Sequence, residues 1–87
     1  MYDKSYEGVR IKLHEIRISQ EVIRYCKDKC KILEQDIEKL EIEIEKITDE
    51  KLLEESRARI WLMKLDYSYY DGRRTSEYLN IQKLKQQ

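Results

Sequence analysis

The sequence predicts an all-α fold: a long coiled-coil-type helix, then a second antiparallel helix that completes a helical hairpin, then a short C-terminal helix. Charged residues make up 41% of the 87-residue chain, proline is absent, and apolar residues recur every seven positions through the first half. This combination is typical of long and coiled helices. We treat residues 1–87 as one helical domain. Because so short a chain buries only about 60% of its unfolded surface, we expect it to dimerise into a bundle.

The first helix is predicted over about residues 7–47. Val9 begins a series of apolar residues spaced by seven, and Cys26 begins a second series that follows the first by three. These spacings define the a and d positions of a heptad repeat, whose side chains pack against another helix. The candidate oligomer interface drawn from them is Val9, Ile16, Ile23, Cys26, Cys30, Leu33, Ile37, Leu40 and Ile44.

The second helix is predicted over about residues 50–71. Its apolar stripe begins at Leu53 and is displaced by two residues from the earlier repeat, which rotates it by about 200° around a continuous helix. A break near residue 48 resolves this mismatch, and Thr48 or Asp49 can cap the helix that follows. No glycine lies in this turn, so a single bent or straight rod is the alternative.

A short third helix is predicted over about residues 76–85. Gly72 is expected to end the second helix as a left-handed C-terminal residue. Thr75 or Ser76 can then cap the third helix. Its apolar residues are Tyr78, Leu79, Ile81 and Leu84.

The N-terminal half of the first helix has a wider apolar face than a two-helix seam requires. A further column at position c recurs every seven residues, with Val22 between it and the seam; its members are Ile11, Ile18, Tyr25 and Ile32. A wide face contacts more than one helix. We therefore expect a homo-oligomer, most simply a dimer, formed either as a parallel coiled coil or as an antiparallel four-helix bundle of two hairpins.

Composition also bears on compartment. The chain has no apolar stretch long enough to span a bilayer and no signal-peptide pattern at its N-terminus, which predicts a cytoplasmic protein without a membrane partner. Cys26 and Cys30 are four residues apart on one helical face and are interpreted as reduced core thiols. A zinc site shared between two chains would need their four thiolates together, and small apolar packing is the simpler interpretation.

Catalytic signatures are not apparent. His14 is the only histidine, it falls at an outward heptad position, and no nucleophile is predicted beside it. The only glycines are Gly8 and Gly72, so no phosphate-binding glycine loop exists. We expect a protein that is not an enzyme and that has no cofactor and no metal.

The most suggestive segment for binding runs from residue 61 to residue 78. It combines the single tryptophan with tyrosines and an arginine pair, the residue types enriched at interface hot spots. The candidate partner-binding residues are Trp61, Tyr69, Tyr70, Arg73, Arg74 and Tyr78. A hairpin would bring this segment beside the basic residues Arg17, Arg24, Lys27 and Lys29 of the first helix, which would also suit a nucleic acid.

The function expected from these features is that of a small non-enzymatic interaction protein, an adaptor or inhibitor. It would self-associate and bind a protein partner through its Tyr/Arg-rich end. One alternative is a nucleic-acid-binding accessory or regulatory protein, and another is an architectural subunit of a larger assembly.

Overall fold

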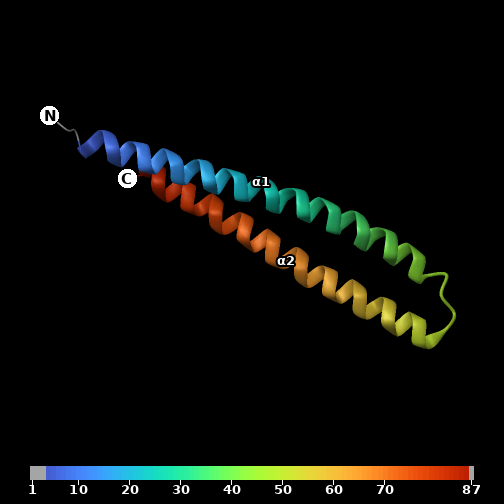
Figure 1. Ribbon diagram of the computed structural model, residues 1–87. Helices are drawn as coiled ribbons and strands as arrows, with labels where there is room; N and C mark the ends of the chain where they lie inside the picture. Colours follow the sequence, from blue (N-terminus) through green and yellow to red (C-terminus); the bar gives the residue numbers. More distant parts are fainter. Residues whose placement is uncertain (1–3, 87) are drawn as a thin grey trace.

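The protein is an extended hairpin of two long helices packed antiparallel along their length (Figure 1). The computed structural model describes residues 4–86, with side chains from residue 8 onward. Helix α1 spans Lys4–Ile44 and α2 spans Glu50–Gln86. The described fold measures 75 × 16 × 14 Å. The expected all-α helical hairpin is confirmed, and the alternative of one continuous rod is not.

The turn lies at the place that the change of heptad phase predicts. Helix α1 ends at Ile44, three residues before the expected end, and the Lys46 and Ile47 N–H groups bond the carbonyl oxygens three residues before them. Asp49 caps α2, because its carboxylate oxygen Oδ1 accepts the Lys51 N–H at 3.0 Å. A five-residue link with an aspartate cap therefore reverses the chain without a glycine.

The helices meet along one seam. In α1 every a and d position from Ile16 to Ile44 is buried or half-buried, and Ser19 occupies a d position that the apolar pattern did not mark. In α2 the matching stripe is Leu53, Ser56, Ile60, Met63, Tyr67, Tyr70, Arg74, Glu77, Ile81 and Leu84. The most buried apolar side chains among the described residues are Cys26, Cys30, Ile60, Ile81 and Leu84.

Helix α2 does not end at Gly72, and no third helix forms within the described residues. Gly72 has a negative φ and lies inside a helix that continues to Gln86. The hydroxyl of Thr75, expected to cap a new helix, donates instead to the carbonyl of Asp71 at 3.0 Å. The reason is packing: Ile81 and Leu84 lie 21 residues after Ile60 and Met63, so they continue the same seam without a change of phase.

Val9 is the one predicted seam residue that stays largely exposed, at 55%. The cross-helix bond between Ser19 and Asn80 fixes the register of the two helices at this end. Val9 lies ten residues before Ser19, so in an antiparallel pair its counterpart would lie ten residues after Asn80, beyond the last residue of α2. Figure 1 shows the same arrangement, with α1 projecting past the end of α2.

Candidate interaction surface

Most residues of the candidate oligomer interface pack within a single chain. Ile16, Ile23, Leu33, Ile37, Leu40 and Ile44 are half-buried along the seam with α2, and Cys26 and Cys30 are buried there. These heptad residues therefore pack against α2 of the same chain. That a second copy of the chain uses the same residues stays a prediction.

One side of the hairpin, the charged flank, is lined by paired polar groups. Glu41 and Lys64 form an ion pair across the helices at 3.4 Å, and the Tyr67 hydroxyl donates to the Glu34 carboxylate at 3.1 Å. The same side includes Lys27, Arg74 and Tyr78, which line one shallow hollow with Ile23. Such a polar border is what the solvent-exposed edge of a two-helix coiled coil requires.

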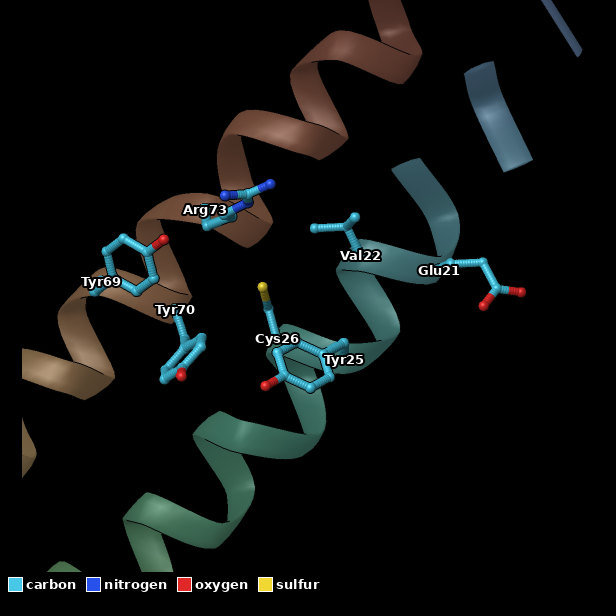
Figure 2. A pocket seen from close by; sticks show the side chains of 7 residues that line it. All are labelled: Glu21, Val22, Tyr25, Cys26, Tyr69, Tyr70 and Arg73. Atoms are coloured by element: carbon cyan, nitrogen blue, oxygen red, sulfur yellow. The ribbon is translucent and has the colours of Figure 1, made fainter. Parts of the chain in front are cut away.

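The opposite side, which we call the apolar flank, carries large apolar and aromatic side chains further from the seam, with charged residues among them. Tyr25 and Val22 of α1 face Tyr69 and Tyr70 of α2 around a hollow of about 380 Å³, with Cys26 at its floor. Figure 2 shows these side chains converging from the two helices, with Arg73 above them and Glu21 pointing away. Seven residues are two helical turns, so the apolar residues of this flank are Ile11, Ile18, Val22, Tyr25 and Ile32 of α1 with Leu62 and Tyr69 of α2. The charged residues Lys29 and Arg73 share the same side.

The rings around this hollow are ordered by edge-to-face contacts. The Tyr25 and Tyr70 centroids are 6.2 Å apart, and those of Tyr69 and Tyr70 are 5.3 Å apart, each pair close to perpendicular. The ammonium group of Lys29 lies 5.6 Å from the Tyr25 ring centroid, within cation–π range. A hydrogen bond to the Tyr69 hydroxyl raises the pKa of Arg73. Aromatic faces and fixed cations thus surround an apolar opening.

The structure divides the predicted partner-binding residues among three places. Tyr69, Tyr70 and Arg73 line the hollow of the apolar flank. Arg74 and Tyr78 lie on the charged flank, where Arg74 forms an ion pair with Asp71. Trp61 is 62% exposed on the side of α2 turned away from α1.

The same placement separates the basic residues proposed to contact nucleic acid. Lys27 and Arg74 lie on the charged flank, whereas Lys29 and Arg73 lie beside the tyrosines of the apolar flank. The 61–78 segment also lies along the middle of the hairpin instead of at its end, because α2 continues well past Tyr78. Lys29 and Arg73 are therefore separated from Lys27, Arg74 and Tyr78.

A ridge on α2 was missed by the sequence reasoning. Trp61, Leu65 and Leu79 are exposed on the side away from α1, and we call them the outer ridge. Their spacing of four and fourteen residues keeps them on neighbouring positions of one helical side. The signal was present in the sequence, since Leu65 and Leu79 continue the heptad phase of the first helix into the second.

The two cysteines lie inside the seam. Both are free thiols, and the Cys30 thiol approaches the Tyr67 carbonyl oxygen at 3.9 Å. Burial raises the pKa of Cys30, which keeps this thiol protonated and weakly reactive at neutral pH. Among the residues that the structure describes, no three His, Cys, Asp or Glu side chains are grouped as a metal site would need.

No helix in the described part of the chain is long and apolar enough to cross a membrane. The chain matches no family model, no curated protein and no solved structure.

Proposed function

We propose that this chain is a small non-enzymatic helical interaction protein, of the adaptor or inhibitor type, that self-associates and binds a protein partner. One observation carries the proposal: after the hairpin has formed its seam, large apolar and aromatic side chains remain exposed at helical spacing on two further surfaces, the apolar flank and the outer ridge. Exposed apolar surface arranged in this way is typical of helix-binding faces.

The outer ridge is the surface we assign to the protein partner. Trp61 and Leu65 are four residues apart, and an amphipathic helix laid along α2 would contact both, with Leu79 four turns further on. Tryptophan is the residue most enriched at binding hot spots. The proposed partner is therefore an amphipathic helix of another protein, with an apolar stripe of its own.

The proposed location of this protein is the cytoplasm. Its support is the pair of reduced cysteines buried in the seam, since oxidising compartments favour disulfides in chains this small. His14, the single histidine, is exposed on α1 away from the seam, which suits a surface role better than a catalytic one.

Site-specific photo-crosslinking tests the proposal. Trp61 is replaced by p-benzoylphenylalanine in the cells that produce the protein, and the same reagent at the exposed residue His14 of α1 serves as the matched control. We expect a discrete adduct with another protein at Trp61, lost when Leu65→Lys is added, and no such adduct at His14. Adducts at both positions or at neither would contradict a partner site on the outer ridge.

The nucleic-acid alternative is tested separately with the purified chain. Because Lys27 and Arg74 lie on a different flank from Lys29 and Arg73, we expect no saturable binding of fluorescent single-stranded or duplex DNA or RNA at low salt. Binding that weakens steeply as salt rises would transfer the function to nucleic-acid recognition. A chain that is insoluble when produced alone would favour the architectural alternative.

A further inference from the structure

We infer that the apolar flank is the docking face for a second copy of this chain, placed antiparallel so that two hairpins form a four-helix bundle. The inference rests on the proposed function, because it names the occupant of one of its surfaces. In this bundle α1 lies on the partner's α1, the turns point in opposite directions, and the two-fold axis passes at the level of Tyr25.

The area exposed by one chain supports a second copy as the occupant. The accessible surface is 7631 Å² for a chain of 10.7 kDa, whereas a compact monomer of this mass exposes about 5500 Å². The excess of about 2100 Å² per chain is of the size that obligate dimers bury. Exposed apolar side chains contribute to this surface, among them Ile18 at 51% and Tyr25 at 55%.

The spacing of the flank supports a two-fold axis at Tyr25. Ile18 and Ile32 lie seven residues before and after Tyr25. An antiparallel second copy therefore places Ile18 of each chain opposite Ile32 of the other chain. A symmetric interface of this type must be self-complementary about its axis. Tyr25 also lies near the middle of α1, so the two hairpins overlap along nearly their whole length.

Charge supports the antiparallel orientation. Residues 31–56, around the turn, carry four Lys or Arg against ten Asp or Glu, a net charge of −6. Residues 57–87 carry seven against three, a net charge of +4, and residues 1–30 carry seven against five, a net charge of +2. An antiparallel pair sets each acidic turn beside the partner's basic open end, whereas a parallel pair would bring two acidic turns together.

The hollow near the axis gives the second copy a place to anchor. It is bordered by Val22, Tyr25, Tyr69 and Tyr70, whose side chains Figure 2 shows on the two facing helices. An axis at Tyr25 brings the partner's Tyr25 to this opening. Tyrosine is suited to such a position because its ring packs on apolar groups while its hydroxyl keeps water or Arg73 as a partner.

Sedimentation equilibrium of the full chain and two matched variants tests the docking face. Ile18→Glu changes an exposed residue of the apolar flank. Leu13→Glu changes an exposed residue of the charged flank, because Leu13 lies four helical turns before Lys27 on the same side of α1. We expect a wild-type dimer, a dissociation constant raised by about 100-fold or more in Ile18→Glu, and little change in Leu13→Glu. Circular dichroism of each variant confirms that its helices persist.

Two results would overturn the docking face. A wild-type chain that is monomeric at about 100 µM has no self-association of the strength inferred. Equal weakening by Ile18→Glu and Leu13→Glu would place the interface elsewhere. Failure here is distinct from failure of partner binding. A monomer that still gives protein adducts at Trp61 keeps the partner-binding part of the proposed function and loses the self-association, and a dimer without such adducts keeps only the self-association.

Engineered cysteines test the orientation. Under mild oxidation, Tyr25→Cys should form a disulfide with its own copy, and an equimolar mixture of Ile18→Cys and Ile32→Cys should form a mixed disulfide. Ile18→Cys alone should not bridge, because its copies lie about 20 Å apart in the antiparallel pair. The wild type, oxidised in the same way, shows whether the buried native thiols Cys26 and Cys30 form disulfides between chains. Bridging by Ile18→Cys alone, or none in the mixture, would contradict the antiparallel register.

Discussion

At the scale of single residues, the most buried part of α1 places small side chains opposite large ones. Cys26 is 1% exposed and Cys30 is 6% exposed, and the α2 residues at their level are tyrosines. Small residues beside large ones let two helices interdigitate without voids. The cysteines are thus explained by packing, with no redox or metal role required.

Serine substitutions distinguish the contributions of the two cysteines to stability. We predict that Cys26→Ser lowers the free energy of unfolding by about 1–3 kcal/mol, because a hydroxyl is placed in an apolar site. Cys30→Ser should cost less, since the Tyr67 carbonyl oxygen lies near the thiol it replaces. Urea denaturation followed by circular dichroism at a single chain concentration measures both. Equal losses would show that the two sites are not packed as described.

Tyr67 makes the stability of the hairpin sensitive to alkaline pH. Its hydrogen bond to Glu34, together with the charge of that carboxylate, raises the pKa of Tyr67 above its usual value. A group with a raised pKa contributes stability that is complete below the unfolded value, about 10, and is lost as pH rises through the folded value. The effect therefore falls in the alkaline range.

The Tyr67→Phe variant tests this dependence. We predict that the urea midpoint of the wild type declines as pH rises above about 10, and that the decline is shallower in Tyr67→Phe. Tyr78→Phe, on an exposed tyrosine of the same helix, is the matched control and should follow the wild type. An identical pH profile for wild type and Tyr67→Phe would count against the bond to Glu34.

At the scale of helices, the length of α2 decides the shape of the molecule. Helix α2 runs almost the full length of α1 because its seam keeps one heptad phase from Leu53 to Leu84. Polar residues occupy part of this seam: Arg74 of the α2 stripe pairs with Asp71, and the buried Ser19 of α1 accepts a hydrogen bond from the neighbouring Asn80 at 3.3 Å. The helix therefore continues where its apolar content alone is weak.

A Gly72→Ala variant tests the continuity of α2. A Cβ added at Gly72 meets nothing within 4 Å, and the residue has a helical backbone conformation. We predict that Gly72→Ala stabilises the fold by about 0.5–1 kcal/mol, measured by thermal or urea denaturation. A helix that ended at Gly72 in the left-handed conformation would instead be destabilised by the same change.

The fold could be predicted from the sequence where the heptad pattern and the local residues agree, and not where they disagree. The heptad from Ile16 to Ile44 and the phase change near residue 48 predicted the seam and the hairpin, because burial of a periodic apolar stripe is what holds two helices together. The prediction for the C-terminal segment was wrong because Gly72 was taken as a helix end, although the phase of Ile81 and Leu84 already opposed a break. Tertiary packing overrides a local glycine signal here.

The candidate surfaces were less predictable for a geometrical reason. Residues close in sequence, such as Arg73 and Arg74, are about 100° apart around a helix and so lie on different flanks. The column from Ile11 to Ile32 was visible as a wide face, but its position beside Tyr69 and Tyr70 depends on the register between helices. That register is set by contacts such as Ser19 with Asn80, which no local pattern marks.

At the scale of the whole molecule, a hairpin with one seam leaves much of its apolar surface uncovered. Its described length of 75 Å and width of 14–16 Å give it the shape of a two-helix rod, with cross-helix polar pairs on the charged flank and exposed isoleucines and tyrosines on the apolar flank. Acidic and basic residues are also segregated toward opposite ends. Both asymmetries favour an antiparallel pair over an isolated chain.

Small-angle X-ray scattering of the full chain is the most direct test of this account. We predict a molecular mass of twice 10.7 kDa with a maximum dimension that stays close to the 75 Å of one hairpin, because the copies overlap side by side. A particle of single mass with a radius of gyration near 20.2 Å would contradict self-association. A particle about 130 Å long, the length of 87 residues in one helix, would contradict the hairpin itself.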